Sequence, residues 1–227
     1  MNRVFSGFRD GALSFFKGCV NHPRMGRRIA IVLVSVVMMG LCVMVFNALG
    51  VGTDPFACFC YGMSAKLGMS LGTFEAIFNT LMILVIFFID RRQFGLGSLA
   101  NMFLVGFSAD FFTWLLKDTV PVRPDPVTQL IWFVPFAALF LVSVAAYIVA
   151  GLGTSPYDSA PNILHDRLVR PRWPRLPFRV TRMAWDSAFA LLGLAIGGSF
   201  GWMTVLCGLG LGPVIDWMAG VMKGIID

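Results

Sequence analysis

The sequence contains little charge for its length. Only 13% of its 227 residues are Asp, Glu, Lys or Arg, whereas 57% are hydrophobic and 14% aromatic, and the mean hydropathy is +0.78. A soluble domain is about 25% charged, because its surface has to be hydrated. The scarcity of charge therefore excludes a soluble globular protein and predicts an integral membrane protein.

Metal-binding and catalytic patterns are also missing. The sequence has two His and five Cys, and none of them form a cluster with the spacing of a zinc site. No HExxH, GxSxG or Walker A motif occurs. Cys58 and Cys60 point in different directions on a helix, so we expect apolar structural cysteines, with a redox site as the alternative. We expect no metal, no cofactor and no enzymatic activity.

Six apolar runs are present, each about 20 residues long, which is the length of a helix that crosses a ~30 Å hydrocarbon core. They are Ile29–Leu49, Leu71–Ile89, Ser98–Leu116, Val127–Ala150, Val180–Ser199 and Gly201–Met222. The sequence therefore predicts an all-α polytopic membrane protein with six transmembrane helices.

The basic residues predict the orientation, because Lys and Arg near spans stay on the cytoplasmic side. With the N-terminus inside, all but three of the 18 Lys and Arg are cytoplasmic, the exceptions being Lys66, Lys117 and Arg123. This count requires that residues 55–67 do not cross the membrane. We expect both termini to be cytoplasmic, and the net charge of +6 then needs no nucleic-acid partner.

The expected domain organisation follows from these spans. Residues 1–28 interleave Phe, Val and Leu with Arg and Lys, which is typical of an amphipathic arm on the anionic inner leaflet. A first membrane repeat then occupies residues 29–118, an outer loop 119–126, and a second repeat 127–227 with a basic cytoplasmic insert at about 165–180.

A Gly-x-Gly-Thr-x-Pro motif occurs twice, each time after a long apolar run: "GVGTDPF" from Gly50 and "GLGTSPY" from Gly151. The glycines permit backbone angles that end a helix. The residues before the prolines have N-cap chemistry, and proline is favoured at the first helical position. The motif residues that we assign to these helix breaks are Gly50, Gly52, Thr53, Pro55, Gly151, Gly153, Thr154, Ser155 and Pro156.

Each break is predicted to begin a short helix, and two positions for these helices stay open. They re-enter the bilayer from opposite sides, with their N-termini facing a substrate or ion, or they lie flat at the two interfaces. The first, Pro55 to about Leu67, is too short to span at ~1.5 Å per residue. In the second, Pro161 is expected to interrupt the helix, which favours a flat or loop-like segment.

The two halves of the chain resemble each other beyond these motifs. "FGLGSLANMFLVGFSADFF" from Phe94 aligns without a gap on "FGWMTVLCGLGLGPVIDWM" from Phe200, and Glu75 in "GTFEAIF" matches Asp186 in "RMAWDSAF". The sequence therefore predicts an internal duplication. Because each unit has three spans, an odd number, the second unit enters from the opposite side, giving an inverted repeat.

Acidic residues within or next to the spans are the candidate substrate or ion-path residues. They are Asp54, Glu75, Asp110, Asp158, Asp186 and Asp216. A carboxylate in a span costs several kcal/mol when it faces lipid, so we expect it to face the bundle interior, a water path or a partner. Three structural alternatives stay open: Asp110 and Asp216 cap or hydrogen-bond the short helices, Glu75 and Asp186 interact with the N-termini of their own helices, or Asp186 forms a salt bridge with Arg182.

With these motifs the sequence resembles the YczE/YyaS/YitT group of bacterial membrane proteins, and in particular its YczE-like branch, over about residues 29–222. The resemblance rests on "GVGTDPF", "LGMSLGTFEAIFNTLMILV", "FGLGSLANMFLVGFSADFF" and "GLGTSPYDSAP". It implies a bacterial cytoplasmic membrane protein and carries over no catalytic residues. The basic insert "LVRPRWPRLPFR" and the long N-terminal arm depart from the group's pattern.

Two functional classes are favoured for such a chain. A transporter or channel for a small solute, with proton coupling, fits the inverted repeat and the interior carboxylates. An accessory or scaffold protein that acts through a partner fits the basic insert. An intramembrane enzyme is the least favoured class. We expect the lipid bilayer and an unidentified small solute as partners, and a homo-oligomer or a membrane partner protein as further alternatives.

Overall fold

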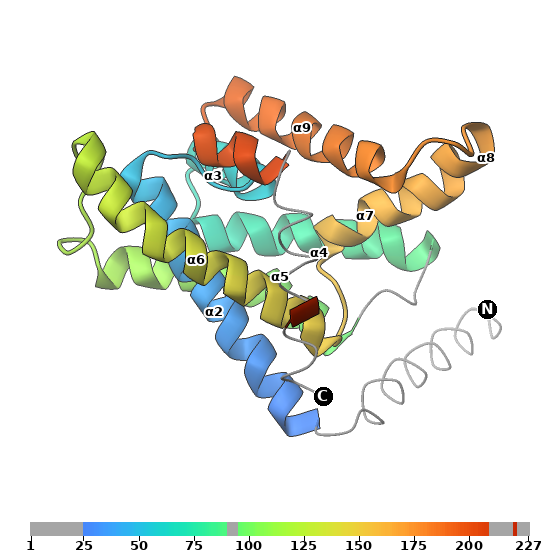
Figure 1. Ribbon diagram of the computed structural model, residues 1–227, viewed down its shortest axis with the longest axis horizontal. Coiled ribbons are helices and arrows are strands. Elements are labelled where there is room, and N and C mark those ends of the chain that lie inside the picture. Colours follow the sequence, from blue (N-terminus) through green and yellow to red (C-terminus); the bar gives the residue numbers. More distant parts are fainter. Residues whose placement is uncertain (1–24, 90–94, 209–219, 222–227) are drawn as a thin grey trace.

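The structure is a computed structural model that describes residues 25–89, 95–208 and 220–221. Every regular element in these ranges is helical (Figure 1). The elements are α2 (Met25–Leu49), α3 (Pro55–Leu67), α4 (Leu71–Ile89), α5 (Leu96–Leu115), α6 (Pro126–Ala150), α7 (Pro156–Leu164), the π-helical turn η2 (His165–Val169), α8 (Arg170–Arg172) and α9 (Phe178–Ile196). A further helix begins at Trp202 and is described as far as Gly208. The rest of the sixth predicted span, with Asp216, lies outside the described residues.

Three of these helices, α2, α5 and α6, are long and apolar enough to cross a membrane. Helices α3 and α4 meet at a bend of 112° and give a fourth candidate when the pair is counted as one broken span. The all-helical prediction is therefore confirmed for the described residues, with three or four candidate spans among them. The predicted total of six spans stays a prediction.

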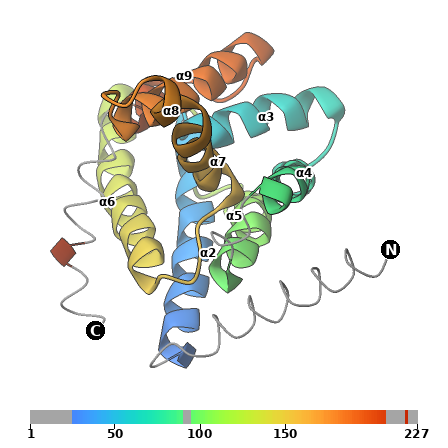
Figure 2. The ribbon, with the colours of Figure 1, turned by 90° about the vertical axis from the view of Figure 1, so that its right-hand side faces the viewer.

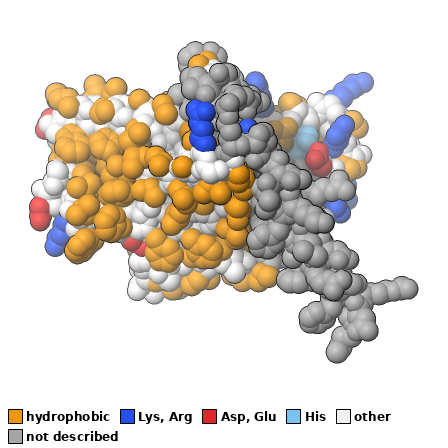
Figure 3. All heavy atoms as spheres, turned by 90° about the horizontal axis from the view of Figure 1, so that it is seen from below, with side chains coloured by type: hydrophobic (Ala, Val, Ile, Leu, Met, Phe, Trp, Pro, Cys, Tyr) orange, Lys and Arg blue, Asp and Glu red, His pale blue; other side chains and the backbone are white. Residues whose placement is uncertain are grey.

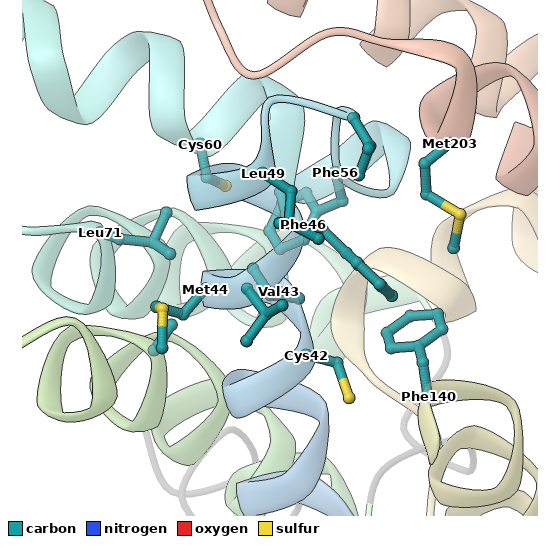
Figure 4. Close-up of a cluster of buried hydrophobic side chains, with 14 of the residues drawn as sticks. Cys42, Val43, Met44, Phe46, Leu49, Phe56, Cys60, Leu71, Phe140 and Met203 are labelled. Carbon is teal, nitrogen blue, oxygen red and sulfur yellow. The ribbon is translucent and has the colours of Figure 1, made fainter. Parts of the chain in front are cut away.

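Helix α2 lies at the centre of the apolar core. It packs against both α5 and α6 (Figures 1 and 2). Its buried side chains form one hydrophobic cluster with side chains of α3, α4 and α6. Within this cluster Phe46 and Leu49 are almost fully buried (Figure 4). Ten residues of α2 are buried on several of its faces, which is the pattern of a helix enclosed by others.

Large apolar side chains also cover the outside of the molecule. Figure 3 shows a face on which hydrophobic side chains form a broad stretch that charged side chains rarely interrupt. Exposed examples are Val85 (62%) on α4, Ile131 (65%) on α6 and Leu191 (64%) on α9. A water-facing surface of this kind would aggregate, so these helices present it to lipid hydrocarbon.

Both helix breaks have the backbone that the repeated motif predicts. Gly50, Gly52, Gly151 and Gly153 all have positive φ, at 72°, 85°, 65° and 106°. The Asp54 carboxylate caps α3 by accepting hydrogen bonds from the backbone N–H groups of Phe56 and Ala57, both at 3.1 Å.

The second break has the same plan. The Ser155 hydroxyl caps α7 by accepting from the N–H of Asp158 at 3.1 Å. Pro55 and Pro156 occupy the first helical positions of α3 and α7. The two breaks differ at their threonines. Thr53 is fully buried, and its backbone N–H donates to the carbonyl of Ser199. At the second break, the hydroxyl of Thr154 shares a hydrogen bond with the hydroxyl of Ser159.

Two details of the second half differ from the sequence prediction. Pro161 does not interrupt the short helix: it is buried inside α7, and the chain continues helically through η2 and α8 to Arg172. Proline removes only one hydrogen bond, and burial of its ring holds the helix together around that gap. The predicted basic insert therefore begins as a helix, and its Arg167 donates to the carbonyl of Ile89 at the end of α4.

The ends of the long helices lie close to the predicted ones. Helix α2 begins at Met25 rather than at Ile29, so Arg28 lies in its first turns. Helix α6 begins at Pro126 and is capped by Asp125. The backbone N–H of Thr128, together with that of Val127, lowers the pKa of the Asp125 carboxyl.

Candidate functional site

The first helices of the two halves bind each other's ends. Arg28, early in α2, donates from Nη1 to the carbonyl of Ala150 at the end of α6, at 3.0 Å. Gln129, early in α6, donates from Nε2 to the carbonyl of Leu49 at the end of α2, at 2.8 Å. Antiparallel α2 and α6 thus exchange one hydrogen bond in each direction, and each bond satisfies a carbonyl that has no partner within its own helix.

Each break also packs against the start of a helix from the other half. The N–H of Gly97 donates to Leu152 at 2.7 Å, and the N–H of Met203 donates to Val51 at 3.0 Å. The N–H of Gly95 and that of Gly201 donate to a hydroxyl three residues later, Ser98 and Thr204, at 3.1 and 3.2 Å.

These contacts leave no space for a side chain at either break. A Cβ added at Gly52 would lie 2.6 Å from the Cα of Gly201, and one at Gly153 would lie 2.8 Å from the Cα of Gly95. Because real Cβ contacts are longer, glycine is required at both positions for packing as well as for its positive φ.

An aromatic cluster lies between the halves. Phe56 on α3 stacks on Tyr157 of α7 with ring centroids 4.7 Å apart. Phe78 of α4 and Phe189 of α9 approach to 6.1 Å, edge to face, and Phe59 contacts both at 5.3 Å. The rings come from both halves and form one continuous set of aromatic contacts between them.

The second half has a network of paired charges, in which one arginine is shared by two carboxylates. Arg182 of α9 forms an ion pair with Asp158 at 2.7 Å and with Asp186 at 2.9 Å. The hydroxyl of Tyr157 donates to Asp186 at 2.6 Å, and that of Ser155 donates to Asp158 at 2.8 Å. The side chain of Asp186 is only 7% exposed, so the ion pair with Arg182 and the hydrogen bond from Tyr157 hold its charge inside the protein. The alternative of an Asp186–Arg182 salt bridge is confirmed.

The first half has a buried acid without such a partner. Glu75 of α4 is 5% exposed, and its Oε2 has no hydrogen-bond partner among the described residues. One turn later Asn79 is 1% exposed, with its Oδ1 also unpaired in the described part of the chain. The Glu75 carboxylate lies against Gly106 of α5, where any side chain would collide with it.

Asp110 is the third acidic candidate of the first half. Its Oδ2 accepts a hydrogen bond at 2.8 Å from the backbone N–H of Gly72, in the first turn of α4. Asp110 therefore caps a helix, as one sequence alternative states, although the capped helix is α4 and not a short one. Asp110 also joins α5 to α4 beside Gly106 and Gly72, whose close approach brings the two backbones together.

The carboxylates of five candidates form one connected group. Asp54 is within electrostatic range of both Asp158 and Asp186, and Glu75 is within range of Asp54 and Asp110. The sixth candidate, Asp216, lies outside the described residues. Asp54 therefore interacts electrostatically with acids of both halves.

Several other residues of the candidate site were not predicted from the sequence. Tyr157 lies inside the second break motif, but its partner Asp186 is 29 residues away, and no local pattern connects them. Asn79 had a readable signal, since it lies one turn from Glu75 on an otherwise apolar span. Arg28 and Gln129 act across distances of 122 and 80 residues.

The cysteines lie in apolar surroundings. Cys42, Cys58 and Cys60 are fully buried free thiols, and Cys207 is partly buried. Within the described ranges, no three His, Cys, Asp or Glu side chains are arranged to hold a metal ion.

Comparison with known sequences assigns the chain to a family. Residues 26–220 match the family described as a family of unknown function, DUF6198. The chain belongs to the DUF6198 family. The match includes both break motifs, the aromatic cluster and all six acidic candidates, so the features described above lie within the shared region of DUF6198 proteins.

Two relatives from Bacillus subtilis strain 168 are similar to this DUF6198 chain. The "Uncharacterized membrane protein YczE" is 27% identical over 165 residues, covering 72% of each chain. The "Uncharacterized protein YyaS" is 25% identical over 117 residues, which cover 52% of this chain and 58% of YyaS. No solved structure matches the chain. The resemblance to a YczE-like group is confirmed, and the chain is a membrane protein of unknown function.

Proposed function

We propose that this protein is a small-solute transporter or channel of the bacterial cytoplasmic membrane, made of two inverted three-span repeats and coupled to protons. The observation that carries the proposal is the buried carboxyl of Glu75, whose Oε2 has no hydrogen-bond partner among the described residues. Acids within membrane proteins are rare and mark ion or proton paths.

The matched contacts support the inverted repeat. Arg28 and Gln129 are 101 residues apart, and so are their acceptors Leu49 and Ala150, with the roles exchanged between the halves. A two-fold arrangement of the repeats requires this exchange of partners. Transporters of this architecture place their substrate site at the interface of the repeats, beside helix breaks.

The two breaks give this interface its polar ends. The N-termini of α3 and α7 are capped by Asp54 and Ser155, and both approach the centre where Phe56 stacks on Tyr157. We propose that α3 and α7 enter the bilayer from opposite sides, with both chain termini cytoplasmic, so that the aromatic cluster closes the path between them.

Glu75 is proposed to carry the coupling proton. An ionised carboxylate without a partner is costly in a dry site, so protonation, a cation or an incoming donor must compensate it. Asn79 adds an unpaired acceptor oxygen one turn away. The paired Asp186 cannot do this as easily, because Arg182 and Tyr157 already satisfy it.

An accessory role is the second candidate function, and one observation favours it. Trp173 is 61% exposed in a segment that also presents Arg172, Arg175 and Arg179. Exposed tryptophan next to arginine is typical of binding surfaces. In that case the protein transports nothing and acts through a membrane partner. For both candidates we propose a non-enzymatic role without a cofactor.

A flux assay tests transport. Purified protein is placed in vesicles filled with a pH-sensitive dye, and acetate, succinate, alanine and ethylammonium are added in turn. We expect saturable, solute-dependent proton movement for at least one probe, and its loss in Glu75→Gln. The control is Asp166→Asn, which removes an exposed carboxylate 65% accessible to solvent and should leave flux unchanged. Absence of flux with every probe, together with a partner protein that co-purifies in defined proportion, contradicts the transport proposal.

A further inference from the structure

A pocket of about 320 Å³ lies where the end of α2, helix α3, the loop before α6 and the end of α9 meet. Its polar lining comes from Asn47, Tyr61, Arg123 and Ser199, and glycines 50, 197 and 198 keep it open. None of the described residues that line it is acidic. The pocket therefore offers positive charge and hydrogen-bond donors without a competing carboxylate.

Arg123 is held in this pocket by an unusual backbone. Its φ is +45°, the one positive value for a non-glycine residue in the described part of the chain. Its N–H donates to the carbonyl of Ala48 at 2.9 Å, which fastens the loop to the end of α2. Strained backbone of this kind persists where the surrounding structure requires it, often at ligand sites.

The side chain of Arg123 lies over the first glycine of the break. A Cβ added at Gly50 would lie 3.2 Å from the Cγ of Arg123, so the absence of a side chain at Gly50 gives the arginine stem its place. Arg123 makes no ion pair with any residue that the structure describes. Its guanidinium is therefore available to a ligand.

The lining selects a chemical class of ligand. A guanidinium binds the two oxygens of a carboxylate or phosphate with two parallel hydrogen bonds. Asn47, Tyr61 and Ser199 also line the pocket, and each carries a side-chain group that can donate a hydrogen bond. A cationic solute would find the charge of Arg123 and no carboxylate to compensate its own.

Tyr61 connects this pocket to the buried acids. It lines the pocket, and it is within electrostatic range of Glu75, Asp110 and Asp54. A solute held by Arg123 would therefore lie beside a residue that interacts electrostatically with Glu75.

We propose that this pocket binds the oxyanion group, a carboxylate or phosphate, of a small solute, with Arg123 as its counter-charge. The proposal rests on the transport function proposed above. It adds that the group of the solute bound by Arg123 is anionic. Binding itself is measurable without transport.

Thermal melting of the purified protein in detergent tests the proposal. Acetate, succinate and inorganic phosphate are compared with ethylammonium at equal ionic strength. We expect the melting temperature to rise with oxyanion concentration and to be unchanged by ethylammonium, because a ligand that binds the folded state stabilises it. The carboxylate and phosphate arms show which oxyanion is preferred.

Two variants locate the effect. Arg123→Gln should weaken oxyanion binding at least tenfold, whereas Lys117→Gln, which removes an exposed cation of the same loop, should leave it unchanged. Should Arg123→Gln fail to fold, Tyr61→Phe replaces it, with a weakening of several fold expected from the lost hydroxyl. An equal melting shift in the wild type and in the folded variant overturns the proposal.

The outcomes separate this proposal from the transport function. Oxyanion binding that requires Arg123, in a protein without flux, retains the pocket and removes the transport function. Flux with an unchanged KM in Arg123→Gln retains transport and removes the pocket.

Discussion

The two halves of this protein hold equivalent acids in different ways. In the second half, Asp186 is paired with Arg182 and accepts a hydrogen bond from Tyr157. In the first half, the matching Glu75 is equally buried, but Leu71 stands one turn before it where the second half has Arg182, and Phe56 stands where the second half has Tyr157. The first acid therefore lacks both the cation and the hydroxyl.

If the two halves are repeats, as proposed, this difference shows how one frame can hold two different arrangements of charge. The backbone contacts at the breaks are closely matched in the two halves, because packing and helix-end hydrogen bonds require them. The charges within that frame are not matched. Under the proposed transport function, the paired network of the second half would keep its structure, whereas the acid of the first half would gain and lose a proton.

The largest expected effect is a complete difference in labelling. A cysteine at Asp125 should react with an impermeant thiol reagent in intact cells, and one at Trp173 only after permeabilisation, since both positions are exposed and predicted on opposite sides. The parent chain, labelled under both conditions, is the control. Labelling of position 173 in intact cells would contradict the inverted arrangement of the two halves.

Alanine at the second glycine of each break should destabilise both halves alike. Gly52→Ala and Gly153→Ala add a Cβ within 2.8 Å of a facing backbone and impose strain at positive φ, with an expected loss of about 3 kcal/mol each. Gly68→Ala is the matched control, because Gly68 has positive φ and no atom near the added Cβ. Equal melting temperatures for all three variants would show that packing at the breaks is unimportant.

The charge networks should respond unequally to neutralisation. Asp186→Asn removes a paired, hydrogen-bonded charge and is expected to cost about 1–3 kcal/mol. Glu75→Gln should change stability by less than about 1 kcal/mol, since burying a neutral amide costs no more than burying an unpaired carboxyl. Thermal melting in detergent measures both. A larger loss for Glu75→Gln would mean that Glu75 has a structural partner after all.

The hydrogen bonds exchanged between α2 and α6 should each contribute moderately. Gln129→Ala leaves the carbonyl of Leu49 without this donor and is expected to cost about 1 kcal/mol. Arg28→Ala should cost somewhat more, because its donor is charged. A double variant tests the exchange, and we expect additive losses because the two bonds lie at opposite ends of the helix pair. Strong non-additivity would indicate that the two ends are coupled.

The smallest effects are expected at the prolines of the breaks. Pro55→Ala and Pro156→Ala lose no hydrogen bond, since proline occupies the first helical position of α3 and α7. We expect each variant to lose about 1 kcal/mol or less of stability, because the buried ring is removed, and thermal melting in detergent measures this loss. Losses greater than those at Gly52 and Gly153 would contradict the assignment of these segments as glycine-terminated breaks.

Local signals in the sequence predicted the parts of this structure that local chemistry determines. The caps at Asp54 and Ser155, the positive φ of the motif glycines and the Arg182–Asp186 pair all involve residues within one helical turn. The membrane class followed from the scarcity of charge alone.

Other features depend on contacts between distant segments, which a single sequence does not reveal. Whether Glu75 has a partner depends on which side chains α5 and α3 bring to it, and the continuous helix through Pro161 depends on the packing around that ring. The pocket at Arg123 is formed by three parts of the chain that are far apart in sequence: residues 47–65, Arg123, and residues 197–200. Periodicity and motif spacing carry no information about contacts between segments that are distant in sequence.

The exchanged hydrogen bonds have a consequence for how the chain is made. The carbonyls of Leu49 and Val51 receive their donors from Gln129 and Met203, which leave the ribosome long after them, whereas Ala150 and Leu152 meet donors, Arg28 and Gly97, that have already been synthesised. An unpaired carbonyl is costly in hydrocarbon, so the first break has to wait in water or inside the insertion machinery. A frame with matched geometry thus matures in an unmatched order, and the second half completes the first as it enters the membrane.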